Sequence, residues 1–461
     1  MIQKPGLLFL LLLWTGTPLF SVKPSDPFLL VEHVSIVQMP SGEILPDQSV
    51  LIHNGRFARI FPSSTYPDLP LEMIVIDGTG KYLVPGITEM HAHIPVPEAE
   101  DESLVEETLF LYLSNGVTTI RGMLGNPYHL ELRERVENDE ILSPRIFTSS
   151  PSLNGNTVPN GQVAVEKVQA YADEGYDFLK IHPGIRRTVF DSLVAAAHVV
   201  GISFAGHVPD DVGIRHAIAA GYASIDHIDG YMQGLVPFEE RQDPSQAGFF
   251  GLNVAGVAST DSISILATAT LDQGIAIVPT QSLFTRWLAP EDPRIMIQEP
   301  EMAYMPAKTR YAWVQSKSSL ISGNDYTADK YATFMHLRIQ LLKGLYDAGV
   351  TLLLGSDAPQ VMNVPGFSLQ HEMQAWQDAG IPPVDILRSA TVLPAQFFES
   401  AKEFGRINEG MAADAMLLSA NPLEDIRNMA QIEGVLVRGT WLDKAQITDR
   451  LQEIATIHTE D

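Results

Sequence analysis

Two histidines stand one residue apart in the stretch VPGITEMHAHIPVP, residues 84–97. If this stretch is a strand, His91 and His93 point to the same face, because successive side chains of a strand alternate between faces. Two neutral imidazoles on one face can bind a divalent metal ion together. The pair alone also fits two polar residues at a strand end, so a metal site needs further ligands elsewhere in the chain.

Other residues of ligand type lie at or near the ends of short apolar segments that are typical of buried strands. They are Lys180 in DFLKIH, His207 in ISFAGH, His227 in SIDHID and Asp357 in LLLGSDA. Burying such groups without partners costs several kcal/mol each. Binding to a divalent metal ion would satisfy the imidazoles and the carboxylate, so the set predicts a metal site.

Lys180 differs from the other candidates because an ammonium ion cannot bind a cation. It is a salt-bridged lysine, a cation that orients an anionic substrate, or a ligand formed when carbon dioxide converts the amine to an anionic carbamate. The chemistry of the residue alone leaves these interpretations open.

From about residue 85 the chain alternates between predicted strands and helices. The segment SLVEETLFLYLSNG has a helical apolar face and ends at Gly116, and VTTIRG follows it as a strand. Repeated units of this kind predict a parallel sheet, and about eight strands fit a closed (β/α)8 barrel better than an open sheet. The chemistry of such barrels lies at the carboxyl ends of the strands. The residues at those predicted ends are His91, His93, Lys180, His207, His227 and Asp357.

The flanks of the predicted barrel are rich in short strands. We predict one part of a β-sandwich in residues 22–84, the barrel in residues 85–400 and the second part of the sandwich in residues 401–461. The fold class is therefore α/β, a (β/α)8 TIM barrel with a small composite β-sandwich domain built from both chain ends. Residues 230–332 are too many for an ordinary barrel connection, and we expect this insertion to cover the barrel mouth as a lid.

The first residues have the layout of a secretory signal peptide. Lys4 precedes an apolar run from Leu7 to Trp14 that is too short to cross a bilayer in the usual way. We predict a signal peptide over residues 1–21 with cleavage near Ser21, and an uncleaved membrane anchor is the alternative. The sequence has no cysteine, which excludes disulfides, thiolate metal ligands and a lipoprotein anchor. The expected location is secreted or periplasmic.

The chain carries 56 acidic and 30 basic residues, a formal net charge of -26. This charge disfavours nucleic acid and an anionic membrane surface as partners. We expect a small-molecule substrate, no nucleic acid, and no membrane contact once the signal peptide is removed. The sequence leaves a homo-oligomer open.

The HxH pair after a Pro-Gly strand, the strand-end lysine, the two later histidines and the GSDA segment together resemble the amidohydrolase superfamily. The similarity is to its imidazolonepropionase-like branch with dipeptidase-type members. The segment GRINEGMAADAMLLSANPLEDI extends the resemblance over nearly the whole mature chain. The resemblance implies a metal-dependent barrel with a composite sandwich, and hydrolysis of carbon–nitrogen bonds.

The resemblance also implies two divalent metal ions, most commonly zinc, and a role for each candidate. One metal would be held by His91, His93 and Asp357, the second by His207 and His227, and both would be bridged by Lys180 as a carbamate. Paired metals lower the pKa of bound water to roughly 7 and stabilise the charge of the tetrahedral intermediate. Asp357 would take the proton from the attacking hydroxide and pass it to the departing amine.

Three further residues are candidates for binding substrate, each with a structural alternative. His182 should face the same way as Lys180, and it lines the pocket or makes a structural hydrogen bond. Tyr231, in HIDGY, is a catalytic candidate that could donate a hydrogen bond to a substrate oxygen. Arg121 could bind a substrate carboxylate bidentately or form an internal salt bridge.

Three more polar residues lie in loops near the predicted barrel mouth. His371 follows the last strand, one position after the histidine that the resemblance leads us to expect, and it is a candidate for a supporting role. Asn154 and Asn160 could reach the pocket, although asparagine in a loop mostly forms turns.

We predict a metal-dependent amidohydrolase that cleaves an amide or peptide bond in a small substrate such as a dipeptide or an N-acyl amino acid. The loop KIHPGI after Lys180 departs from the Ser/Gly-rich loop of the dipeptidase-like relatives, which weakens assignment of the substrate by analogy. One alternative is a mononuclear hydrolase or deaminase that acts on cyclic amides or amidines with Lys180 unmodified. Another is a catalytically inactive periplasmic binding protein, which predicts a missing ligand, and none of the candidates is missing.

Overall fold

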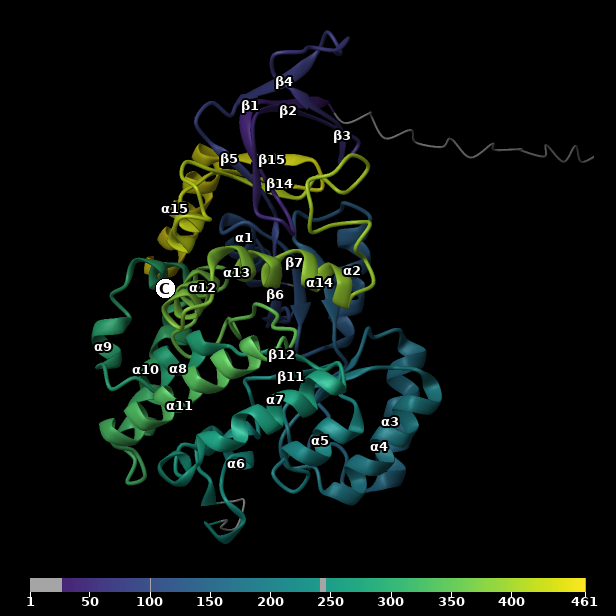
Figure 1. The fold of residues 1–461 in the computed structure, drawn as a ribbon. Coiled ribbons are helices and arrows are strands. Elements are labelled where there is room, and N and C mark those ends of the chain that lie inside the picture. The colour runs from purple at the N-terminus through teal and green to yellow at the C-terminus, as the bar shows by residue number, and fades with distance from the viewer. Residues whose placement is uncertain (1–26, 100, 241–245, 461) are drawn as a thin grey trace, which may run out of the picture.

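The computed structural model describes residues 27–99, 101–240 and 246–460. The predicted signal peptide, residues 1–21, lies outside the described residues. A β-rich part lies at the top of Figure 1 and a larger part of strands and helices lies below it. No single helix in the described ranges is long and apolar enough to cross a membrane; one helix pair, Phe249–Val257 with Thr260–Asp272, passes the same test only together and bends by 115°.

Both ends of the chain contribute strands to one eight-stranded sheet. Its strands are β1 (Phe28–Gln38), β2 (Glu43–His53), β3 (Arg56–Pro62), β4 (Met73–Asp77), β5 (Tyr82–Pro85), β13 (Ala415–Leu418), β14 (Ile432–Val437) and β15 (Thr440–Asp443). The order is β15-β14-β13-β5-β1-β2-β3, with β4 beside β1, and the two chain ends meet where Met416 pairs with Val84. Asn54 and Gly55 both have a positive φ in the tight turn between β2 and β3, as the favoured hairpin turns require.

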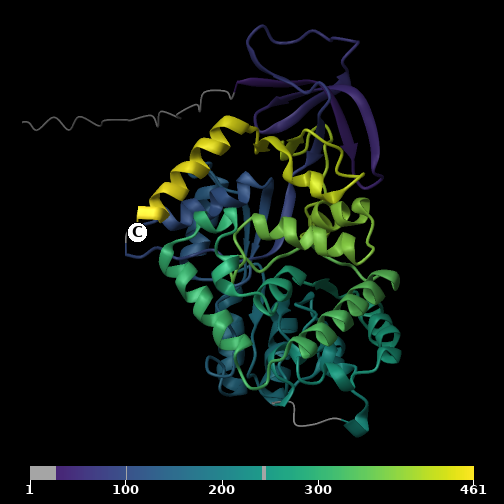
Figure 2. The ribbon, with the colours of Figure 1, turned by 90° about the vertical axis from the view of Figure 1, so that its left-hand side faces the viewer.

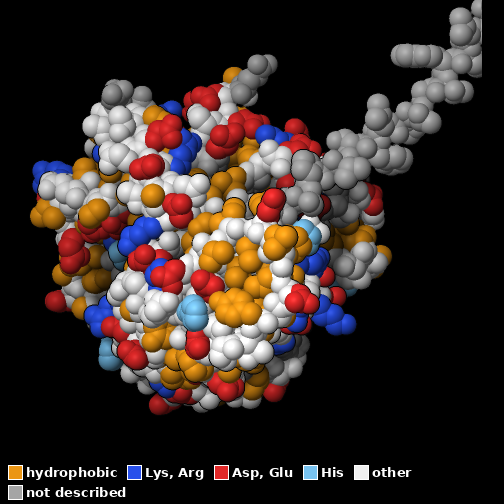
Figure 3. Space-filling model, turned by 90° about the horizontal axis from the view of Figure 1, so that it is seen from above, with side chains coloured by type: hydrophobic (Ala, Val, Ile, Leu, Met, Phe, Trp, Pro, Cys, Tyr) orange, Lys and Arg blue, Asp and Glu red, His pale blue; other side chains and the backbone are white. Residues whose placement is uncertain are grey.

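The last helix ties this sheet to the rest of the molecule. Helix α15 (Lys444–Glu460) follows β15 and contacts β14 and α1 (Ser103–Ser114). Figure 2 shows it running from the sheet down the side of the molecule. Seen from above, this end of the protein presents apolar side chains among acidic ones (Figure 3). Exposed apolar residues here include Leu71, Ile74 and Val75, on or just before β4.

The larger part holds two parallel sheets. The first has the order β6-β7-β8 and the second β12-β11-β10-β9. Their bounds are β6 (Ile87–Ala92), β7 (Val117–Gly122), β8 (Arg145–Thr148), β9 (Leu179–Ile181), β10 (Phe204–Gly206), β11 (Ser224–Asp226) and β12 (Ala276–Val278). All of these strands except β8 are buried along their whole length, as expected for parallel strands covered on both faces. The predicted α/β class is confirmed.

Helices connect these parallel strands along the chain. They are α1, α2 (Pro127–Glu137), α3 (Gly161–Glu174), α4 (Arg187–Val200), α5 (Ile214–Ala220) and α7 (Ile263–Asp272). α3 and α4 end at Gly175 and Gly201, whose φ values of 86° and 75° suit glycine, and each glycine is followed within a few residues by the next strand.

Isolated parallel bridges join the two sheets. They are Ser149 to Phe178 and Leu153 to Ile181 between β8 and β9, Ile277 to Leu352, and Ala92 to Ala358. Residues 351–357 thus run between β12 and β6, where Leu353 N donates to Ile277 O at 2.9 Å and Met90 N donates to Leu354 O at 2.9 Å. Asp357 is therefore placed beside the end of β6.

Residues 230–332 are not one continuous insertion as predicted, because α7 and β12, a strand of the second parallel sheet, lie within them. The remaining pieces are α6 (Tyr231–Gly234), η1 (Phe238–Glu240), η3 (Phe249–Gly251), η4 (Ala255–Val257), η5 (Thr260–Ser262), α8 (Gln281–Trp287), α9 (Pro293–Met296), η6 (Pro300–Tyr304), α10 (Ala307–Ile321) and the start of α11 (Ala328–Asp347). After α11 come α12 (Phe367–Asp378), α13 (Pro383–Ala390), α14 (Val392–Phe397) and η7 (Ile426–Ala430).

Candidate metal centre

Two histidines and an aspartate meet at the end of β6. His93 Nε2 lies 2.7 Å from Asp357 Oδ1, and His91 Nε2 lies 3.4 Å from the same oxygen. One ligand atom from each of the three side chains lies within 4.8 Å of the others. The structure thus brings together the three residues that the family resemblance assigns to the first metal.

The other two predicted histidine ligands, His227 and His207, lie next to this cluster. The ring centroids of His91 and His227 are 4.5 Å apart, and those of His227 and His207 are 4.7 Å apart. His182 lies next in line, with its ring centroid 5.0 Å from that of His207. Burial lowers the pKa of His91 and His227 well below 6.5, so both imidazoles are neutral, the form that binds a metal.

Hydrogen bonds orient the rings of His207 and His227. His207 Nδ1 lies 3.0 Å from Asp229 Oδ2, and His227 Nδ1 lies 2.9 Å from Thr280 Oγ1. A proton held on Nδ1 leaves the lone pair of Nε2 to a metal, which is the usual arrangement of a metal-binding histidine and its supporting group.

The backbone is strained where these side chains leave their strands. His227, Thr280 and Asp357 have φ values of 64°, 47° and 66°, in the left-handed region. Such conformations cost about 1–3 kcal/mol each in residues other than glycine and cluster at functional sites. Backbone hydrogen bonds hold them there, from His227 N to Val278 O at 2.7 Å and from Asp357 N to His91 O at 2.9 Å.

Lys180 is fully buried on β9 and faces this group of side chains. Its Nζ has no hydrogen-bond partner among the described residues, and it lies 3.9 Å from Asp226 Oδ2. Burial lowers the pKa of Lys180 to about 8, because removing the ammonium from water outweighs the attraction of Asp226. The side chain is thus a buried amine without a bonded partner, directly beside the candidate ligands.

Asp226 is an important residue that the sequence interpretation missed. It is fully buried at the end of β11, and its Oδ2 lies 3.2 Å from His91 Nδ1 and 3.9 Å from Lys180 Nζ. The signal was available in SIDHID, because Asp226 directly precedes a predicted ligand at a strand end.

Glu89 is a second missed residue. Its carboxylate accepts hydrogen bonds from His91 N at 2.8 Å, Ser356 N at 2.9 Å and Ser356 Oγ at 2.5 Å. Burial raises the pKa of Glu89 to about 8. It connects β6 to the segment that carries Asp357. It stands two residues before His91, on the same predicted strand face, which could have identified it.

The structure decides between the two interpretations of Arg121 in favour of the internal salt bridge. Arg121 is completely buried, and it donates from Nη2 to Asp226 Oδ1 at 3.0 Å, from Nη1 to Ser224 Oγ at 2.9 Å and from Nε to Met90 O at 2.7 Å. With its guanidinium engaged in this way, Arg121 is positioned to orient Asp226, and the predicted contact with a substrate carboxylate is corrected.

Tyr231 also differs from its prediction. It is fully buried on α6, and its hydroxyl lies 2.5 Å from Thr270 Oγ1 on α7. Burial raises the pKa of Tyr231. The hydroxyl joins two helices, so the predicted hydrogen bond to a substrate oxygen is not what this geometry provides.

His182 lies beside His207 and makes a side-chain hydrogen bond of the kind given as its structural alternative. Its Nδ1 lies 2.5 Å from Ser152 Oγ, and burial lowers its pKa to about 2, so the ring is neutral. Asn154 donates to the same Ser152 Oγ at 2.9 Å, which gives it an indirect supporting role. Asn160 accepts from Val163 N at 3.0 Å and caps α3, the structural alternative.

His371 belongs to a separate ionic cluster on the insertion side. His371 Nε2 lies 2.9 Å from Glu301 Oε1, and Arg286 pairs with both Glu299 and Glu301. The acidic side chains and His371 are close enough together to suggest a cation site. The guanidinium already neutralises the carboxylates, so the cluster is an ion-pair network.

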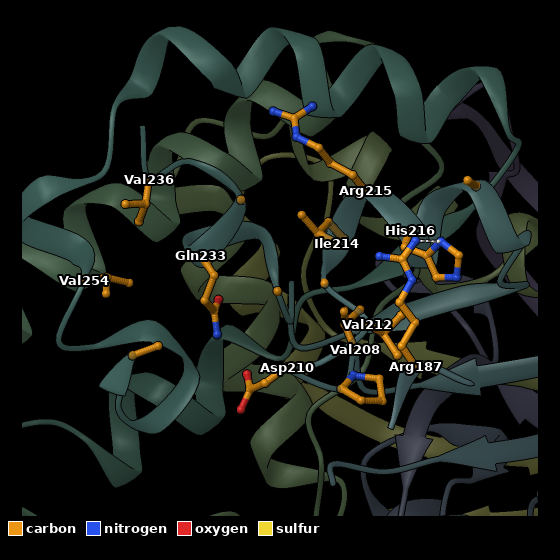
Figure 4. Close-up of a pocket in the computed structure, with 16 residues that line it drawn as sticks. Arg187, Val208, Asp210, Val212, Ile214, Arg215, His216, Gln233, Val236 and Val254 are labelled. Carbon is orange, nitrogen blue, oxygen red and sulfur yellow. Dashed lines mark hydrogen bonds between the residues drawn. The ribbon is translucent and has the colours of Figure 1, made fainter. Parts of the chain in front are cut away.

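A cavity of about 500 Å³ lies beside His207, between the residues after β10 and helices α5 and α6 (Figure 4). Val208 and Gly230 line it, each next in sequence to a residue of the His207–Asp229 pair. Its wall is largely apolar, with Asp210 and Gln233 pointing inward in Figure 4. None of the candidate metal ligands lines this cavity.

Comparison with known proteins identifies relatives along most of the chain. A model of the amidohydrolase family matches residues 82–442. Ochratoxinase of Aspergillus niger is 21% identical over 456 residues, which cover 89% of this chain and 85% of that protein. Adenine deaminase 3 of Rhizobium meliloti (strain 1021) is 27% identical over 226 residues, 44% of this chain, and the match spans only 36% of the deaminase.

Solved structures share the fold at low sequence identity. A bottromycin amidohydrolase superimposes with a TM-score of 0.70 at 21% identity, covering 96% of this chain and 94% of that one. A protein described as a putative prolidase from Bifidobacterium longum gives a TM-score of 0.65 at 22% identity, covering 94% of this chain and 100% of that one.

Proposed function

Because this chain belongs to the amidohydrolase family, we propose that it is a metal-dependent hydrolase that cleaves an amide or peptide bond in a small substrate. Members of this family are hydrolytic enzymes that act on carbon–nitrogen bonds. This membership argues against the alternative, considered from the sequence, of a catalytically inactive binding protein. The observation that carries the proposal is the convergence of His91, His93 and Asp357, with His207 and His227 beside them.

We also infer that the two parallel sheets belong to one (β/α)8 barrel. The isolated bridges on both sides of the sheets support this inference, because residues 351–357 provide the link between β12 and β6. The candidate ligands then share the carboxyl end of the barrel strands. A crystal structure in which residues 351–357 leave β6 would contradict the inference.

The side chains present fit divalent metal ions. His91, His93 and Asp357 would hold one ion, and His207 and His227 would hold a second, with neutral imidazole and carboxylate donors that suit zinc. Two observations support this assignment: Lys180 Nζ is buried without a hydrogen-bond partner among the described residues, and the contact of His91 Nδ1 with Asp226 Oδ2 at 3.2 Å leaves His91 Nε2 facing Asp357. Burial of such groups without compensation is costly.

Lys180 is the proposed bridge between the ions as a carbamate. In this reaction the neutral Nζ forms a bond to the carbon of carbon dioxide and releases a proton to water, leaving an anionic carbamate. Its complete burial, its unpaired Nζ and its position beside Asp226 and the histidines support the proposal. The carbamate oxygens would supply the anionic ligands that an ammonium cannot.

The proposed reaction adds water across an amide and releases a carboxylic acid and an amine. Bound divalent metal would polarise the carbonyl and activate water. Asp357 would accept the proton of the attacking water and transfer it to the nitrogen of the departing amine. Glu89 holds the segment of Asp357 through Ser356, and His93 fixes the Asp357 carboxylate.

We propose a dipeptide or an N-acyl amino acid as the substrate. Prolidase and Xaa-Pro dipeptidase are the descriptions of solved relatives with this fold, and ochratoxinase matches most of the chain. The match to adenine deaminase favours a second candidate, deamination of a cyclic amidine at a mononuclear site. We also propose that the protein is secreted or periplasmic, which N-terminal sequencing of the exported protein tests.

Hydrolysis of dipeptides and N-acyl amino acids is expected to depend on metal. Treatment with a chelator should abolish release of the amine, and zinc added back should restore it. Adenine in the same assay, with ammonia as the readout, tests the deaminase candidate. Hydrolysis that survives complete removal of metal, measured by elemental analysis, would contradict the proposed mechanism.

Replacing Lys180 with alanine is expected to lower the metal content from two ions per chain to one or none. The bridging ligand is lost, while each ion keeps only its own side chains. Elemental analysis of the purified protein measures the change, with Lys308→Ala as the matched control, because Lys308 is exposed on α10. An unchanged metal content in Lys180→Ala rules out the bridge.

A further inference from the structure

Phe250 brings an aromatic ring from the insertion to the candidate metal centre. It lies on η3, in the segment between α6 and α7. Its ring centroid is 5.4 Å from that of His227 and 5.9 Å from that of His207. Phe250 as a whole is half-buried.

The backbone around Phe250 adopts left-handed conformations that direct its side chain toward His207 and His227. Phe250 has a φ of 51°, and it stands between Gly248 and Gly251 with φ values of 73° and 87°. A β-carbon at Gly251 would come within 2.7 Å of the Met232 side chain, so the turn packs closely on α6. A left-handed phenylalanine is unfavourable, and such residues cluster where the side chain has a function.

Aromatic packing holds the other side of Phe250. The ring centroid of Phe284, on α8, is 5.0 Å away in an edge-to-face arrangement. Arg338 lies over Phe284 with Cζ 3.6 Å from the ring centroid, and its Nη1 donates to His227 O at 2.8 Å. The residues that hold Phe250 therefore also hold the backbone of His227, which fixes the ring relative to the metal centre.

We propose that Phe250 is a specificity-determining residue, whose ring forms an apolar wall beside His207 and His227 and favours substrates with an aromatic ring on the acyl or the amine group. This inference rests on the proposed hydrolysis of dipeptides or N-acyl amino acids. Edge-to-face and offset contacts between aromatic rings favour such a substrate beyond the burial of its apolar surface. Phe250 makes this selection without taking part in the bond-breaking step.

The experiment compares kcat/KM for substrate pairs that differ only in an aromatic ring, using the full-length, metal-loaded protein. The pairs are N-acetylphenylalanine with N-acetylalanine, and N-benzoylglycine with N-acetylglycine. In Phe250→Ala the aromatic preference in at least one pair should fall by about 2- to 10-fold, the range expected for one aromatic contact. Phe250→Tyr keeps the ring and should keep the preference.

Phe238→Ala is the matched control, because Phe238 lies on the same insertion and is 82% exposed. Its aromatic preference should equal that of the unaltered protein. Thermal unfolding of each variant separates loss of the fold from loss of selectivity. Unchanged preferences in both substrate pairs for Phe250→Ala would overturn the inference.

A binding measurement tests the role of Phe250 even if the proposed hydrolytic function is wrong. If the unaltered protein hydrolyses none of the four substrates, the proposed function fails. Calorimetry of the metal-loaded protein with benzoate and with acetate then tests Phe250 directly. Tighter binding of benzoate that weakens in Phe250→Ala and persists in Phe250→Tyr supports the aromatic wall; equal binding ratios in all variants overturn it.

Discussion

Asp357→Asn is expected to lower kcat for amide hydrolysis by about 10²- to 10⁴-fold, the usual contribution of a positioned general acid–base group. Asparagine keeps the size of the side chain and tolerates the left-handed backbone that Asp357 adopts, with φ of 66°. The substitution therefore removes the negative charge and the proton acceptor while leaving the local backbone conformation accessible. Steady-state kinetics at saturating substrate measure the effect.

Metal content separates the two roles proposed for Asp357. A fall in kcat with unchanged metal content indicates proton transfer, and a parallel loss of one ion indicates that metal binding also depends on the carboxylate. Asp272→Asn is the control, because Asp272 is exposed at the end of α7 and its charge is removed by the same change. A kcat within about twofold of the unaltered protein would contradict both roles, because loss of general acid–base catalysis costs far more.

The convergence of His91, His93 and Asp357 could be predicted from the sequence, whereas the contacts around them could not. His91 and His93 could be placed because a strand has a fixed alternation of side chains, and the chemistry of a strand end follows from the α/β class. The same alternation puts Glu89 on the face of His91. Its role through Ser356 could not be derived, because residues 356 and 89 meet only when the chain has folded.

Arg121 and Tyr231 show where residue type misleads. Both carry groups that can bind a substrate oxygen, and both follow or lie near a strand end. In the structure Arg121 pairs with Asp226 and the Tyr231 hydroxyl contacts Thr270. A sequence states the chemistry of a polar group but not whether another buried group already satisfies it.

In the flanks and the insertion, too, local structure could be predicted from the sequence and tertiary contacts could not. The alternation of β1 and the turn residues after β2 predict strands locally, and the sharing of one sheet by β5 and β13 joins residues more than 300 positions apart. The register of that pairing is a tertiary property. Phe250 likewise has no sequence pattern of its own, because its position depends on Gly248 and Gly251 and on the aromatic packing of α8.

Arg121→Met is expected to lower the free energy of unfolding by about 3–5 kcal/mol, the usual cost of removing one partner of a buried ion pair. The change leaves the fully buried Asp226 with Ser224 as its remaining hydrogen-bond donor and with Lys180 Nζ 3.9 Å away. The midpoint of thermal unfolding of the metal-loaded protein measures the loss. Arg294→Met is the control, because Arg294 pairs with Asp292 at the surface with 78% of its side chain exposed, where ion pairs contribute little.

A second substitution tests whether the unpaired charge causes the loss. In the double variant Arg121→Met, Asp226→Asn, the buried carboxylate is neutral, so part of the lost stability should return. If the double variant is less stable than Arg121→Met, Asp226 stabilises the fold chiefly through Lys180 and His91, its other neighbours. Recovery of stability without recovery of activity is the expected result, since the asparagine at position 226 no longer carries the charge that attracts Lys180 and contacts His91 in the candidate metal centre.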